Sequence, residues 1–248
     1  MTSPHNTGTS AEPVSAKPAG LWEDFIDIFI SPAEVFERRR NSGFFVPLIV
    51  FAVVSTVISI VGHGAMQPIL DAEFARGIAS AAKQNPNMSP AAMESARGMS
   101  DKFFPVIVAV VSLLTPLMVG VLLWITGKFV SAKEGIGAAC MIAAYSFLPR
   151  ILDTILRIVQ GFMLDPSGLN GAYRVTLSPA RFLDPDTASP VMIALLGRID
   201  LFTIWVTILL AVGLSVVARI PRSRAAIAAV LVWVLASLPA VFQALRAS

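Results

Sequence analysis

The sequence predicts an all-α, polytopic membrane protein with five transmembrane helices. Of its 248 residues, 55% are hydrophobic and 14% are charged, whereas soluble domains carry about 25% charged residues. The mean hydropathy is +0.73. Five stretches are long and apolar enough to cross a hydrocarbon layer of about 30 Å. These observations predict the fold class before any motif is considered.

Residues 1–20 are rich in Pro, Ser, Thr, Gly and Ala, and Lys17 is their only basic residue. They contain no apolar run of the kind that forms the centre of a signal peptide. We therefore expect a disordered tail.

Residues 21–40 form an amphipathic segment. Apolar residues recur at helical spacing, and acidic residues occupy the other side; they are Leu21, Trp22, Phe25, Ile26 and Phe29 on one side, and Glu23, Asp24 and Asp27 on the other. This pattern predicts a helix at the cytoplasmic membrane surface. Ser31 and Pro32 then predict the start of a second short helix, with Ser31 as its cap and Glu34 as the capping-box partner.

The acidic side of this segment is unfavourable for binding to the membrane surface, because anionic lipid headgroups would repel it. Alternatively, the acidic side binds a basic loop of the same chain, with Arg219, Arg222 and Arg224 as the candidate counter-charges. Two roles stay open for the segment. It is either an anchor for the N-terminus or a helix that recognises a partner protein.

Residues 43–248 form the predicted membrane domain. Its spans are about 43–66, 103–127, 135–160, 200–218 and 225–245. Pro47 falls in the first turn of its helix, where it does little harm, and Pro116 predicts a kink. The third apolar run continues to about Leu164, which is too long for one perpendicular span, so it must tilt, bend at Pro149 or end among the headgroups.

Two hydrophilic segments, 67–102 and 165–198, separate the spans and are each about 35 residues long. The first includes an alanine-rich stretch with Met88, Met93 and Met99 that we expect to be helical. Basic residues are dense before the first span and in the short loops after the second and fourth spans, and sparse in the two long loops. The positive-inside rule therefore predicts a cytoplasmic N-terminus, two external loops and an external C-terminus.

The sequence contains no pattern typical of an enzyme or a cofactor site. Phosphate-binding, zinc-protease and nucleophile-elbow motifs are missing, and the only histidines are His5 and His63. The single cysteine, Cys140, lies in an apolar run and is expected to be a small buried side chain. The net charge of +3 comes from short clusters that flank apolar runs, which argues against nucleic acid as a partner.

Charged residues nevertheless occur inside the third predicted span. Arg150, Asp153, Arg157 and Gln160 fall within a sector of about 80° of a helix, so they form one polar stripe. Asp153 can pair with Arg150 three residues earlier or with Arg157 four residues later. The stripe is either a structural ion-pair cluster, for which Asp200 is a further candidate partner, or part of a proton or ion path.

Three stretches in this order resemble a known family. The first is Ser31, Pro32 and Phe36 ahead of the first span; the second is Tyr145, Ser146 and Pro149 in the third; the third is Asp200, Phe202, Trp205 and Leu209 in the fourth. The chain is similar to the bacterial branch of the Yip1-domain family over about residues 25 to 245. The two external loops are long for that family.

The resemblance implies a bundle of five spans in the bacterial cytoplasmic membrane. Eukaryotic members resemble adaptors for small GTPases, but no motif of this chain matches a GTPase-binding segment. We therefore expect a non-enzymatic membrane-organising or adaptor protein without a cofactor or metal, whose partners are the lipid bilayer and either another membrane protein or further copies of itself. The alternative is a small transporter or channel-like permease that uses the polar stripe; the sequence identifies no small-molecule ligand.

Overall fold

The computed structural model describes residues 20–84 and 89–247, and throughout these residues the regular elements are helices. The predicted tail, apart from Gly20, and Met88 lie outside the described residues. The helices are α1 (Leu21–Ile30), α2 (Pro32–Arg38), α3 (Phe45–Val61), α4 (His63–Gln84), α5 (Pro90–Phe129), α6 (Ile136–Ser146), α7 (Arg150–Met163), η1 (Pro166–Gly168), η2 (Ala172–Val175), η3 (Pro179–Phe182), α8 (Pro190–Gly197), α9 (Leu201–Ala218) and α10 (Arg222–Ala247).

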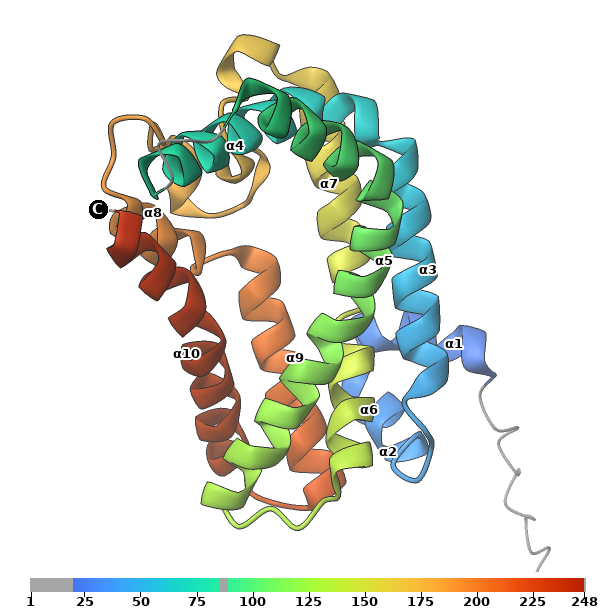
Figure 1. The fold of residues 1–248 in the computed structure, drawn as a ribbon. Coiled ribbons are helices and arrows are strands. Elements are labelled where there is room, and N and C mark those ends of the chain that lie inside the picture. Colours follow the sequence, from blue (N-terminus) through green and yellow to red (C-terminus); the bar gives the residue numbers. More distant parts are fainter. Residues whose placement is uncertain (1–19, 85–88, 248) are drawn as a thin grey trace, which may run out of the picture.

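The long helices run up and down in alternation and form a bundle (Figure 1). Four helical segments have the length and apolar composition of a membrane span, and there are five if α3 and α4 together count as one. The α3–α4 pair bends by 85°, so α4 leaves the bundle at its upper end. Large apolar side chains are exposed along α3, α5 and α10, as expected for helices that contact lipid.

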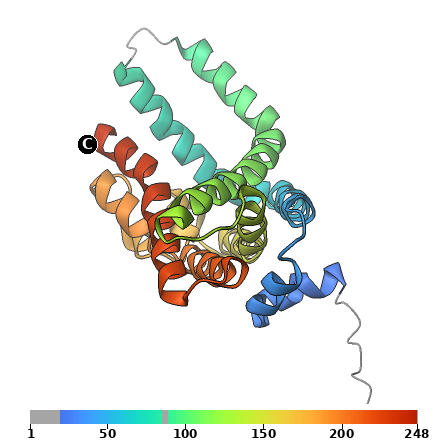
Figure 2. The same cartoon turned by 90° about the horizontal axis from the view of Figure 1, so that it is seen from below.

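The segment between the first two predicted spans is more helical than a loop. The helix α5 begins at Pro90 and includes both Pro105 and Pro116 in one continuous element, and Ser89 caps it by accepting from the amide of Ala92. Seen from below, α4 and the first part of α5 extend away from the bundle as two arms (Figure 2). A salt bridge of 2.6 Å between Asp71 and Arg97 joins the arms.

The third predicted span consists of two helices. The helix α6 ends at Ser146, three residues without helical assignment follow, and α7 begins at Arg150 directly after Pro149. All eight residues from Ala139 to Ser146 are buried, including Cys140. The half-span α6 is therefore the centre of the bundle, packed between α5 and α9.

Two glycines allow α6 to pack this closely. A Cβ atom at Gly120 of α5 would lie 2.7 Å from the Cα of Cys140, and one at Gly213 of α9 would lie 2.5 Å from Cγ2 of Ile142. Both distances are shorter than real side chains permit. The glycines therefore set the spacing between α6 and its two neighbours.

Candidate functional site

One residue of each family-like motif belongs to a single apolar cluster beside the lower half of the bundle. Phe36 of α2, Tyr145 of α6 and Leu209 of α9 are each at most 2% exposed. The ring of Phe36 fits against Gly213, where a Cβ atom would approach its Cε1 to 3.1 Å. Residues far apart in the chain thus form one binding surface for α2, which we call the seat.

Aromatic contacts hold α1 on the same seat. The rings of Phe25 and Tyr145 are 6.4 Å apart, and Phe29 meets Trp205 edge to face at 5.7 Å. Phe202 and Trp205 stack at 6.3 Å along α9. Such aromatic pairs contribute about 0.5–1.5 kcal/mol each beyond the area they bury.

The polar residues of the motifs have structural positions. Pro32 begins α2 as predicted, but Ser31 makes no side-chain cap there, so the expected capping box is absent. Pro149 lies at the break between α6 and α7. Ser146 is fully buried, and its hydroxyl has no hydrogen-bond partner among the described residues.

An ion cluster fixes the acidic side of α1. Asp24 is 0% exposed and accepts from Nε of Arg38 at 3.1 Å, from Nη2 of Arg38 at 2.9 Å and from Nε of Arg39. Asp27 pairs with Nη2 of Arg38 at 2.6 Å, and this hydrogen bond is the main reason that the pKa of Arg38 is raised. The prediction that Arg219, Arg222 and Arg224 supply the counter-charges is therefore wrong. Arg38 and Arg39, at the end of α2, lie nearer along the chain and pair with Asp24 instead.

The third arginine of that run ties the segment to α9. The guanidinium of Arg40 donates from Nη2 to the carbonyl oxygens of Val216 and Val217, at 2.8 Å each. These carbonyls belong to the last turn of α9, where no following helical amide can bond them. A cation at this end also interacts favourably with the helix dipole.

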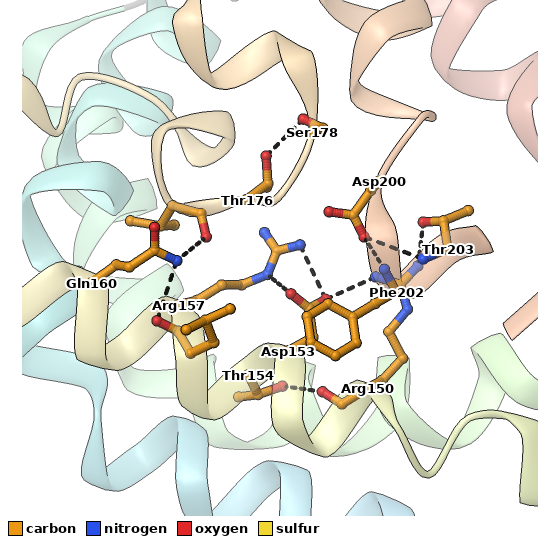
Figure 3. A network of polar contacts seen from close by, with 12 residues as sticks. Arg150, Asp153, Thr154, Arg157, Gln160, Thr176, Ser178, Asp200, Phe202 and Thr203 are labelled. Carbon is orange, nitrogen blue, oxygen red and sulfur yellow. Dashed lines mark hydrogen bonds and ion pairs between the residues drawn. The ribbon is translucent and has the colours of Figure 1, made fainter. Parts of the chain in front are cut away.

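The polar stripe forms a second cluster (Figure 3), on α7 in the upper half of the bundle (Figure 1). Asp153, 4% exposed, pairs with both of its predicted neighbours. Its Oδ2 lies 2.9 Å from Nη1 of Arg150, and its Oδ1 lies 2.7 Å from Nε of Arg157. Gln160 continues the stripe, donating to the carbonyl of Val175 at 3.0 Å and accepting from Arg181 at 3.0 Å.

Asp200 does not join the stripe as an ion-pair partner. One of its carboxyl oxygens accepts from the amides of Phe202 and Thr203, at 3.0 and 3.2 Å, and so caps α9. The other oxygen is buried without a partner within the described part of the chain. Arg150 instead donates to the hydroxyl of Thr203 at 2.8 Å.

A cavity of about 430 Å³ lies beside the stripe, with walls from α3, α5, α7 and α10. It is lined by Phe51, Val111, Ser112, Thr115, Val119, Phe147, Arg150, Asp153, Thr154, Arg157, Arg198 and Ala236. Sequence reasoning missed Arg198, which lies just before α9 and donates to the hydroxyl of Ser237 at 2.9 Å. Burial, followed by repulsion from Arg150, lowers the pKa of Arg198.

A buried carboxyl group at the lower end of the bundle was also missed. Glu134, between α5 and α6, is 8% exposed, and neither carboxyl oxygen has a hydrogen-bond partner in residues 20–84 and 89–247. Burial raises the pKa of Glu134 above its ordinary value, against the smaller opposing effects of its own backbone amide and of Lys128. A single acidic residue in a short loop gives no sequence signal for such burial.

Comparisons with known proteins agree with the motif pattern. The family model described as Yip1 domain matches residues 26–242, which includes the seat of α1 and α2 and the polar stripe. No curated protein and no solved structure shows significant similarity to the chain. Among the described residues, no group of three His, Cys, Asp or Glu side chains is placed to hold a metal ion.

Proposed function

Because this chain belongs to the Yip1 domain family, we propose that it is a non-enzymatic membrane organiser that acts through α1 and α2. We call residues 21–40 the collar. The collar lies beside the lower half of the bundle (Figure 1). It presents an amphipathic helix to the bilayer in a fixed orientation, and the helix enlarges one leaflet by occupying it.

The proposal rests on which side of α1 faces the bundle and which side is exposed. Its inward side carries Asp24, which is fully buried against two arginines, whereas Glu23 is exposed. Its outward side is apolar, since Trp22, Ile26 and Ile30 are 79%, 64% and 75% exposed. Residues spaced by four lie on one helix face, so the exposed face is a continuous apolar strip of the kind that binds the boundary of headgroups and acyl chains.

The ion cluster also reduces the repulsion of the acidic side by anionic lipid, although Glu23 stays exposed outside the cluster. Asp24 and Asp27 face arginines of the collar itself, so their charges are compensated before the helix meets any lipid. The same apolar strip could seat a helix of another membrane protein, which is the adaptor form of this function. Membrane reshaping without any partner distinguishes the organiser from the adaptor.

The test is reconstitution of the full chain into vesicles, followed by cryo-electron microscopy of their shape. We expect the wild-type chain to reduce vesicle diameter or to form tubules, and the double variant Ile26→Ser, Ile30→Ser to leave vesicles round. Phe182→Ser is the control, because Phe182 is 81% exposed but lies in the opposite, upper loops. Vesicles that stay the same with all three proteins would reject the organiser and leave the adaptor form, for which co-purification from native membrane is the assay.

The cavity beside the polar stripe favours a second candidate, a small permease. Arg150, Asp153 and Arg157 line an open cavity between helices, as charged groups on a transport path do. The variant Asp153→Asn distinguishes the candidates. If the ion pairs are structural, the amount of protein in the membrane falls; if the protein keeps its abundance while solute or proton flux in proteoliposomes falls, the permease is the better description.

A further inference from the structure

The cavity beside the stripe carries more positive than negative charge. Its lining contains three guanidinium groups, those of Arg150, Arg157 and Arg198, and one carboxylate, that of Asp153; three minus one leaves +2. Asp200 lies close enough to Arg198 to favour its charged form. Even if Asp200 is counted, three minus two leaves +1.

The excess charge comes with unused hydrogen-bond donors. Each guanidinium has five N–H groups in a fixed fork, and Arg198 uses only Nε, toward Ser237. Its Nη1 and Nη2 make no hydrogen bond within the described chain, and neither does Nη1 of Arg157. All three atoms remain accessible to a ligand. These donors belong to residues that line one cavity.

Arg150, Arg157 and Arg198 are partly buried at the wall of the cavity. A charge at such a wall is costly where no opposite charge compensates it, because the dielectric constant there is lower than in water. Arg150 and Arg157 share the charge of Asp153, at 2.9 and 2.7 Å. Arg198 has no such carboxylate at hydrogen-bond distance in the residues described. An anion in the cavity would compensate the charge and would fill the open donors at the same time.

The rest of the lining restricts the kind of anion. Hydroxyl groups come from Ser112, Thr115 and Thr154, and bulky apolar walls come from Phe51 and Phe147. Guanidinium groups match the tetrahedral oxygens of phosphate in pairs and bind them by charge-assisted hydrogen bonds. The volume of about 430 Å³ is that of a small-molecule site with convergent polar groups and apolar sides.

We propose that this cavity is a binding site for a phosphate group, with Arg198 as the principal ligand and Arg157 as the second. The phosphate is either the headgroup of an anionic phospholipid or a free phosphate from solution. The site is separate from the collar, so the proposal does not depend on the proposed function. The phosphate balances the excess of arginine in the lining of the cavity, whereas Asp153 holds Arg150 and Arg157 in position.

The test uses the full chain purified in a maltoside detergent, which contains no phosphate. Binding is measured by the shift in melting temperature and by native mass spectrometry during titration with phosphatidylglycerol, with inorganic phosphate, or with a monoglucosyl diacylglycerol as the phosphate-free lipid. Arg198→Gln removes the principal ligand, and Arg198→Lys keeps its charge. Arg222→Gln is the matched control, because Arg222 is exposed at the far, lower end of α10.

We expect the wild type and Arg222→Gln to bind phosphatidylglycerol or inorganic phosphate, and Arg198→Gln to bind about tenfold to a hundredfold more weakly, as for the loss of a charge-assisted hydrogen bond. Arg198→Lys should fall between them. Binding of phosphatidylglycerol alone identifies the lipid headgroup as the source, and binding of inorganic phosphate identifies free phosphate. Equal affinity of Arg198→Gln and Arg222→Gln, or no preference over the glucosyl lipid together with no phosphate binding, would overturn the proposal.

Discussion

Replacing Asp24 by Asn tests whether the ion cluster is what orients the collar. The change keeps the size of the side chain and removes its charge. Arg38 and Arg39 of α2 then lose the charge of Asp24, while Arg38 keeps its pair with Asp27. The helix α1 should therefore separate more readily from α6 and α9, although the bundle itself keeps its core.

The size of the effect follows from burial. Removing one partner of a buried ion pair costs about 3–5 kcal/mol. The side chains of Arg38 and Arg39 retain 30% and 21% exposure, so water compensates part of the loss, and we expect about 2–3 kcal/mol. That corresponds to an increase of roughly 30-fold to 150-fold in the opening of α1.

Hydrogen–deuterium exchange measures this opening directly, since it reports the local unfolding of individual helices. Amides of residues 21–38 should exchange faster in Asp24→Asn, whereas those of α6 and α9 should not change. Asp27→Asn is the matched control: Asp27 is 33% exposed, and an exposed pair contributes only about 0–1 kcal/mol. Equal protection of α1 in Asp24→Asn and Asp27→Asn would refute the reasoning from burial.

Three further predictions concern other parts of the bundle. Because burial raises the pKa of Glu134, the folded chain holds the proton of this carboxyl group more tightly than the unfolded chain. The free energy of unfolding therefore falls as pH rises from the ordinary pKa of 4.5 through the raised pKa. Glu134→Gln should raise the melting temperature at neutral pH and remove this pH dependence when melting is measured over a pH series. Gly120→Ala should lower stability by about 1–3 kcal/mol, because its new Cβ overpacks against Cys140. The control is Gly137→Ala, whose Cβ meets nothing within 4 Å and should raise stability slightly. Thermal melts of both variants measure the two changes. Reporter fusions after residues 80, 130, 180 and 221 should show the first and third positions outside and the other two in the cytoplasm, and a cytoplasmic signal at 80 or 180 would reverse the predicted orientation.

Patterns local to one helix were readable from the sequence. The period of 3.6 residues predicted the helix α1, and spacing by three and four predicted both pairs of Asp153. The predicted sides of α1 were not correct in detail, because Phe25 and Phe29 pack inward with Asp24 whereas Trp22 and Ile26 are exposed. The break near Pro149 is one of the three alternatives that the length of the third apolar run allowed, although Pro105 and Pro116 lie within the continuous helix α5. The family resemblance, carried by three motifs in order, agrees with the match over residues 26–242.

Features that depend on packing between distant helices were not readable. Nothing in the sequence shows that Arg198 shares a cavity with Arg150 and Arg157, because the two segments are 40 residues or more apart along the chain. The pairing of Asp24 with Arg38 and Arg39 requires the turn between α1 and α2, which the expected cap at Ser31 did not describe correctly. Asp200 resembled an ion-pair partner, but the amides at the start of α9 compete for its carboxylate.

The seat of the collar has a consequence for how the chain is assembled during synthesis. Arg40 is made 176 residues before Val216, whose carbonyl it binds, and Phe36 fits against Gly213 of the same late helix. At about 5–20 residues per second, the first helices wait roughly 10–35 s before their binding surface leaves the ribosome. During that interval the cluster of Asp24, Arg38 and Arg39 is complete within 16 residues, so the collar can hold its shape before the bundle exists. The part of the chain that is made first is then among the last to find its final place.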